Sequence, residues 1–170
     1  WRQMGVAGGN DLEIEHLNVD APAPGAANIT SVVGDARALE GFADGEFEVV
    51  FSNSVIEHVG GWDDQRRMAH AVQRVGRRFF VQTPNRYFPL EPHFLFPGFQ
   101  FLPLRARIEL VRRFALGYHD RIPDPAEARA AVSEIRLLSE AELRRLFPTA
   151  RIHRERVLGL KKSLVAYGGW

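Results

Sequence analysis

The chain has 170 residues, which suits a single domain, and its 45 % apolar and 25 % charged residues are typical of a globular protein. A formal net charge of +1 gives no field that would gather nucleic acid, so we expect no nucleic-acid partner. The absence of cysteine excludes a disulfide framework and thiolate chemistry, and it is compatible with the cytoplasmic location that we expect. No run of about 18 apolar residues predicts a membrane span, so no membrane partner is expected either. The oligomeric state is left open.

The first part of the chain predicts two strands, each followed by an aspartate. Apolar side chains alternate over residues 12–19, which predicts a strand that ends before Asp20. Residues 21–28 are interrupted by proline and glycine and predict a loop, and residues 29–33 predict the next strand, which leads to Asp35. From the residues alone, Asp20 can also be a solvated turn residue, and Asp35 can cap a short helix.

The central stretch, residues 47–59, organises the rest of the chain. Residues 47–51 form an apolar run that is typical of a strand buried on both faces. Residues 52–54 are small and polar, as in a strand-to-helix turn, and an apolar pattern at helical spacing then resumes, so we expect Glu57 and His58 to begin a helix. In an open α/β sheet, ligands bind just beyond the carboxyl ends of the strands, which is where this turn would lie.

A second helix–strand unit and an unusual aromatic segment follow. A helix with apolar residues at 68–75 precedes a buried strand at 79–81, whose end lies at the same sheet edge as the central strand. Residues 86–104 hold many phenylalanines and prolines, and we interpret them as a cover on the substrate side. Two other interpretations stay open, namely a separate small core and an exposed aromatic patch for a membrane or protein partner.

The last third of the chain predicts helices and then a pair of strands. Residues 105–114 form an amphipathic helix, and a short helical stretch follows within 117–130. Residues 139–142 form a capping box that opens a helix running to Phe147. Residues 152–158 and 162–167 read as two closing strands.

The segment from Gly34-Asp35-Ala36 through residues 47–59 resembles the class I S-adenosylmethionine-dependent methyltransferases of the type 11 group. Thr83-Pro84-Asn85-Arg86 is similar to the end of the next strand in that group. The resemblance, over about 14–170, implies a single α/β domain: a Rossmann-like methyltransferase sheet with helices on both faces, an antiparallel edge, and residues 86–130 as a lid-like insertion. The family's first strand and its Gly-rich loop are not found here. We therefore expect an N-terminally truncated domain with a gap in its sheet.

The resemblance also implies S-adenosylmethionine as the cofactor and assigns residues to it. Asp20 would hold the ribose hydroxyls, and Asp35 would bind the adenine amino group, while Ala36 lets the ring lie close. A carboxylate suits both roles because it is an acceptor of hydrogen bonds only. Asn53 and Ser54 would face the methionine portion of the cofactor or the incoming substrate.

The implied reaction is methyl transfer to a small-molecule acceptor by in-line substitution. Positioning alone can lower such a barrier by about 7–11 kcal/mol, so binding residues matter more than a nucleophile. A hydroxyl acceptor would need a base, for which His58, His93 and Glu91 are candidates, whereas an amine would not; Tyr87 and Glu91 are expected to contact the substrate. For His58 the alternative is a partly buried structural histidine. The six histidines show no His-x-x-x-His spacing, so no metal site is expected.

Two other functions are weighed against this one. A chain without the Gly-rich loop could be a catalytically inactive methyltransferase-like scaffold or a fragment of an active enzyme. A nicotinamide-dependent oxidoreductase shares the Rossmann topology, but it predicts a different strand order and gives no reason for the 34–59 segment.

Overall fold

The computed structural model describes residues 13–18 and 29–170. Asp20 and the ends of the strand predicted at 12–19 lie outside these residues. The strands are β1 (Ile14–Asn18), β2 (Ile29–Val33), β3 (Phe47–Asn53), β4 (Gly76–Pro84), β5 (Leu90–Glu91), β6 (Phe96–Pro97), β7 (Arg151–Val157) and β8 (Leu160–Gly168). The helices are α1 (Trp62–Val75), α2 (Leu104–Arg113), α3 (Pro125–Glu134) and α4 (Glu140–Leu146), with a short 3-10 turn, η1 (Phe99–Phe101).

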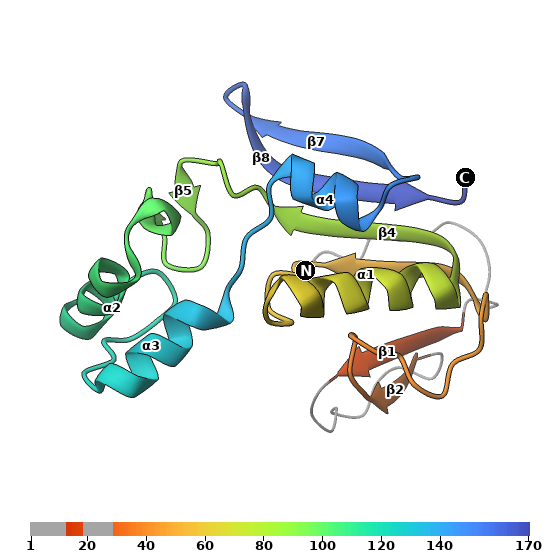
Figure 1. Ribbon diagram of the computed structural model, residues 1–170, viewed down its shortest axis with the longest axis horizontal. Helices are drawn as coiled ribbons and strands as arrows, with labels where there is room; N and C mark the ends of the chain where they lie inside the picture. Colours follow the sequence, from red (N-terminus) through yellow and green to blue (C-terminus); the bar gives the residue numbers. More distant parts are fainter. Residues whose placement is uncertain (1–12, 19–28) are drawn as a thin grey trace.

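The main sheet has four strands in the order β3-β4-β8-β7 (Figure 1). β3 and β4 run parallel, and β8 pairs antiparallel with both β4 and β7, which confirms the predicted antiparallel edge. β1 and β2 form a separate parallel pair. Within residues 13–18 and 29–170 no strand pairs with the outer edge of β3, so the expected gap in the sheet is present.

One face of the main sheet carries the core. Met68 and Val72 of α1 and Leu143 of α4 pack with Phe79 and Val81 of β4 in one buried cluster. On the opposite face, β3 exposes Val49 by 42 % and Phe51 by 65 %. The fold class is therefore confirmed, but the described helices that pack on this sheet, α1 and α4, lie on one face and not on both.

The helix after β3 begins later than predicted. Glu57 and His58 lie in a turn, where the His58 N–H donates to the Val55 carbonyl over 2.8 Å. Gly60 follows with φ +117, a conformation that favours glycine. The Gly61 N–H then donates to the Asp64 carboxylate over 3.0 Å, so α1 starts at Trp62. The glycine pair thus ends the turn before a helix can form, and the carboxylate and imidazole are left on an irregular segment.

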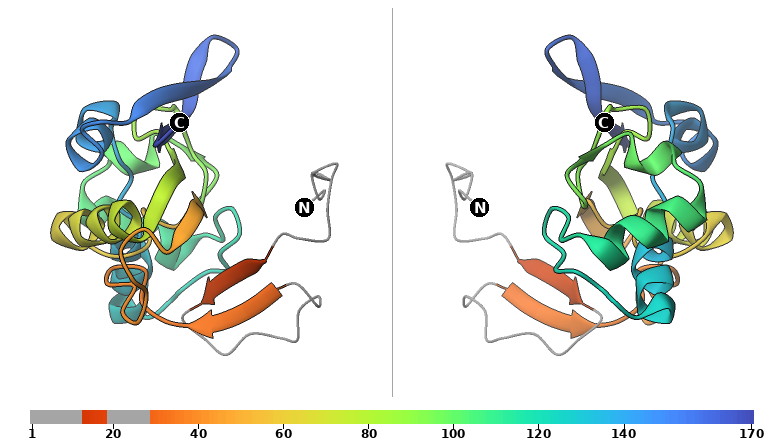
Figure 2. Two further views of the ribbon diagram at one scale, coloured as in Figure 1. Left: turned by 90° about the vertical axis from the view of Figure 1, so that its right-hand side faces the viewer. Right: turned by 90° about the vertical axis from the view of Figure 1, so that its left-hand side faces the viewer.

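The segment between β4 and α4 forms a lobe with its own core. We call residues 86–134 the cover lobe; it contains β5, β6, η1, α2 and α3, and it lies beyond the end of β4 (Figures 1 and 2). Phe94 and Phe99 are buried in it and stack with ring centroids 4.2 Å apart. The segment thus has a separate small core, which was one of the alternative interpretations from the sequence. Its action as a lid stays a prediction.

Every helix of the described residues is too short or too polar to cross a membrane.

Candidate functional site

The carboxyl ends of β3 and β4 meet at one sheet edge, where Asn53 stands in register with Gln82. Ser54 follows with φ +54, an uncommon conformation for serine, and it is held there by Gln82. Its N–H donates to the Gln82 carbonyl and to Oε1, each over 3.1 Å, and its hydroxyl donates to Oε1 over 3.0 Å. Strain of this kind persists only where surrounding bonds fix it, and it is frequent at ligand sites.

A cavity of about 430 Å³ lies between the β1–β2 pair and β3. Ala36 and Asn53 both line it, so the structure brings two of the predicted cofactor residues to one space. The rest of its lining is mostly apolar and comes from β1, β2, β3, α1 and the segments that flank β3. The cavity has the size of a small-molecule site, and its lining suits the flat, partly apolar surface of a nucleoside.

Asp35 lies next to this cavity, directly before Ala36. Its carboxylate accepts hydrogen bonds from the Arg37 backbone N–H over 2.8 Å and from the Arg37 guanidinium at 2.8–2.9 Å. These bonds with Arg37 hold the pKa of Asp35 below its usual value. The predicted helix cap is only partly seen, since residues 36–38 form a turn and no helix. Sequence analysis did not identify Arg37 as a partner.

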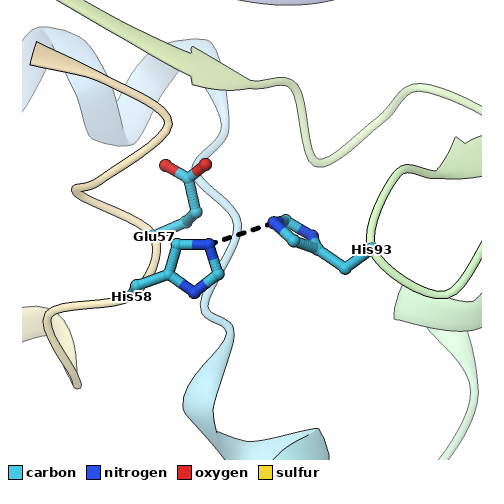
Figure 3. Close-up of side chains that lie close together, drawn as sticks. All are labelled: Glu57, His58 and His93. Atoms are coloured by element: carbon cyan, nitrogen blue, oxygen red, sulfur yellow. Dashed lines mark hydrogen bonds between the residues drawn. The ribbon is translucent and has the colours of Figure 1, made fainter. Parts of the chain in front are cut away.

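Two histidines that sequence analysis considered separately are in contact. His58 comes from the turn after β3 and His93 from the cover lobe, and their Nε2 atoms lie 3.2 Å apart (Figure 3). The two rings are nearly perpendicular, at 84°. The side chains are 34 % and 17 % exposed, so the pair is reachable from solvent. Because 35 residues separate them in the chain, no local spacing could have indicated this contact.

Glu91 fixes the orientation of His93 from behind. Its carboxylate is buried, accepts the backbone N–H groups of His93 and Phe94 over 2.8 and 2.7 Å, and lies 2.7 Å from His93 Nδ1. Burial disfavours the charged imidazole, but the hydrogen bond and charge of Glu91 outweigh it and raise the pKa of His93. Burial, and then the neighbouring His93, lower the pKa of His58. Glu91 was predicted to contact substrate, and here it positions an imidazole.

Glu57 lies fully buried beside the two rings (Figure 3). Its Oε2 accepts the Thr83 hydroxyl over 2.9 Å, while Oε1 has no hydrogen-bond partner among the described residues. Burial raises the pKa of Glu57. Ligand atoms of Glu57, His58 and His93 lie within 4.8 Å of one another. Sequence analysis found no metal-ligand spacing, yet the fold gathers three residues of the kinds that bind metals.

A second cavity, of about 270 Å³, lies between the cover lobe and the segment that enters α4. Arg86, Arg107 and Arg136 line it together with Glu91 and Gln100. Arg107 Nε is shielded from solvent and has no hydrogen-bond partner among the described residues. Burial and the nearby Arg86 lower the pKa of Arg107. Of the two residues that were predicted to bind substrate, Glu91 lines this cavity.

Tyr87, the other residue predicted to bind substrate, lies on the surface of the cover lobe. It is 66 % exposed, and its ring stacks on Phe101 with centroids 6.4 Å apart. It is not among the residues that line the 270 Å³ cavity. Its substrate contact therefore stays a prediction, and the arginines of the cavity, which were given no role from the sequence, are better placed.

The family comparison matches a segment in the amino-terminal part of the chain. Residues 9–78 match the model of a family described as methyltransferase domain. An uncharacterized protein of Mycobacterium tuberculosis is 30 % identical over 76 residues, which are 45 % of this chain and 26 % of that protein. The match thus spans about a quarter of the length of that curated relative.

Solved structures show the same fold at low identity. A SAM-dependent methyltransferase of Methanosarcina mazei superposes with a TM-score of 0.51 at 13 % identity, covering 91 % of this chain and 80 % of that one. A Rhodobacter sphaeroides protein described as a Zn-dependent alcohol dehydrogenase also gives 0.51, at 16 % identity, covering 82 % and 65 %. At such identities the likeness shows the fold alone. With the family match over residues 9–78, it confirms the resemblance of this chain to the class I S-adenosylmethionine-dependent methyltransferases.

Proposed function

We propose that the full-length protein transfers a methyl group from S-adenosylmethionine to a small-molecule acceptor by in-line substitution. The observation that carries this proposal is that Ala36 and Asn53 share one cavity, with Asp35 beside it, in a chain whose residues 9–78 match a methyltransferase domain. We assign Asp35 to the adenine amino group and Asn53 and Ser54 to the methionine portion. Asp20, proposed for the ribose, lies outside the described residues.

The reaction requires the protein mainly to position the cofactor and the acceptor relative to each other. When bound, the sulfonium of the cofactor supplies a methyl carbon that is attacked by an acceptor lone pair as the carbon–sulfur bond breaks. The chain must align the two partners and keep bulk water away, which is where its binding residues act. A hydroxyl acceptor also has to lose a proton, and His58 and His93 are the proposed groups for this because their ring nitrogens lie at the sheet edge.

We place the acceptor in the 270 Å³ cavity of the cover lobe. Its volume suits a small molecule, and three arginines around one space favour an acceptor that carries a carboxylate or phosphate. We assign Arg107 to the anionic group of the acceptor because its buried Nε lacks a partner among the described residues. The net charge of +1 gives no strong overall field for nucleic acid, so we propose a small molecule as the acceptor.

Calorimetry with S-adenosylhomocysteine on the full-length protein tests the proposal. We expect micromolar binding, and the variant Arg107→Gln should retain that affinity while losing turnover of anionic acceptors. Arg105→Gln, an exposed arginine on the same helix, is the matched control. Absence of any binding heat would favour the alternative of an inactive methyltransferase-like scaffold, for which the unpaired outer edge of β3 among the described residues is the supporting observation.

A further inference from the structure

We propose that Glu57, His58 and His93 form a binding site for a divalent transition-metal ion of the zinc class. The three side chains come from two segments that meet only in the folded chain (Figure 3). Two imidazoles and one carboxylate form a donor set that suits zinc, cobalt and related ions, which prefer nitrogen with some oxygen. Such a set of three protein ligands leaves a further position open, as in catalytic and not structural zinc sites. A histidine that binds the ion through Nε2 cannot also take a proton there, so the proton acceptor proposed above applies to the metal-free chain.

The distance between the imidazoles fits a shared ion. Zinc–nitrogen bonds of about 2.0–2.1 Å at tetrahedral angles place two ligand nitrogens about 3.3 Å apart. The Nε2 atoms of His58 and His93 are 3.2 Å apart, with their rings nearly perpendicular. A proton shared between the two nitrogens would give the same distance. The groups around the two rings must therefore distinguish a metal site from a hydrogen bond.

Glu57 supplies the second, independent observation. Its side chain is fully buried, Thr83 satisfies Oε2, and Oε1 has no partner among the described residues. Leaving a buried carboxylate oxygen without a partner is energetically unfavourable, so such a group calls for a ligand. A cation bound by both imidazoles would lie near this carboxylate, since one of its oxygens and a ring nitrogen of each histidine lie within 4.8 Å of one another.

The surroundings of the histidines are those of metal-bound imidazoles. Metal-binding histidines almost always donate their other ring N–H to a carboxylate, which fixes the tautomer and the ring orientation. Glu91 holds His93 Nδ1 at 2.7 Å in this way, and Glu134 lies 3.9 Å from His58 Nδ1. The His93 ring is thus held by a carboxylate with Nε2 toward His58, whereas Glu134 is too far from His58 for a hydrogen bond.

Cobalt binding to the full chain, without cofactor, tests the site. Co²⁺ should bind with a visible absorption band typical of tetrahedral nitrogen and oxygen ligands, and Zn²⁺ should displace it while excess Mg²⁺ should not. His58→Ala and His93→Ala should abolish the band, and Glu91→Gln should weaken binding by about 10–100-fold. His70→Ala, an exposed histidine of α1, is the matched control and should change nothing.

A second measurement does not depend on whether the variants fold. In wild-type protein with labelled histidines, paramagnetic Co²⁺ should broaden the imidazole signals of His58 and His93 and spare those of His70 and His153. Broadening at His70 or His153 but not at His58 and His93, displacement by Mg²⁺, or an unchanged band in folded His58→Ala and His93→Ala would each overturn the site. Binding of cobalt without binding of S-adenosylhomocysteine would reject the proposed function and leave the metal site standing.

Discussion

Replacement of Asp35 by alanine should weaken binding of S-adenosylhomocysteine about 10-fold to 150-fold. The estimate follows from the loss of one hydrogen bond to a charged acceptor, worth roughly 1.5–3 kcal/mol. The Asp35 side chain is 47 % exposed and so remains reachable by a ligand while Arg37 holds it, and solvent screening at that exposure favours the lower part of the range. The bonds from Arg37 also keep the carboxylate ionised, since they lower its pKa.

Isothermal titration calorimetry on the full-length protein measures this effect. Arg37→Ala is the informative companion, since it removes the ion pair but keeps the carboxylate, which stays ionised at neutral pH; its affinity should change much less. Asp63→Ala, an exposed aspartate paired with Arg66, is the matched control and should leave affinity unchanged.

The outcome separates a ligand-binding carboxylate from a structural one. If Asp35 only holds the turn through the Arg37 backbone N–H, Asp35→Ala will lower the melting temperature and leave the affinity of the folded protein as it was. That result would refute the assignment of Asp35 to the adenine. Loss of affinity in the Asp63→Ala control would show that charge alone accounts for the effect.

The remaining predictions concern stability. Hydrogen bonds, first from Arg154, lower the pKa of Glu140 to about 2. Its contribution to stability is therefore present above the ordinary pKa of a glutamate and is lost as the pH falls toward 2. In urea unfolding, we expect Glu140→Gln to lower the free energy of unfolding by about 1–2 kcal/mol at pH 7, after allowance for screening, and by less at pH 2.5. Gly76→Ala would place a Cβ 2.7 Å from Val50 Cγ2 at the junction of α1 and β4, and this overpacking should cost about 1–3 kcal/mol in the same assay; an unchanged midpoint would mean that the junction can shift. Leu143→Ala, at a fully buried position, should cost about 2–5 kcal/mol, and a smaller loss in calorimetric melting would contradict its place in the core.

Local patterns in the sequence were enough for the elements of the sheet. The apolar runs predicted β2 at residues 29–33, most of β3 and the centre of β4. The prediction that residues 47–51 are buried on both faces was wrong, because β3 exposes Val49 and Phe51 on one face. The capping box at Ser139 is confirmed by reciprocal bonds with Glu142, since both partners lie within one turn of helix. The resemblance carried by residues 34–59 also predicted the fold class.

The geometry of the site was decided by tertiary structure. The sequence alone could name His58 and His93 as candidates, but their contact depends on the path of the cover lobe, which no periodicity encodes. Glu57 was expected on a helix, and only the fold shows that it is buried, bonded to Thr83 through one oxygen and without a hydrogen-bond partner for the other among the described residues. The physical reason is that hydrophobic periodicity reports only on neighbouring residues within one helix or strand. A site at a sheet edge is formed by loops, and the course of these loops depends on packing between segments that are distant in the sequence.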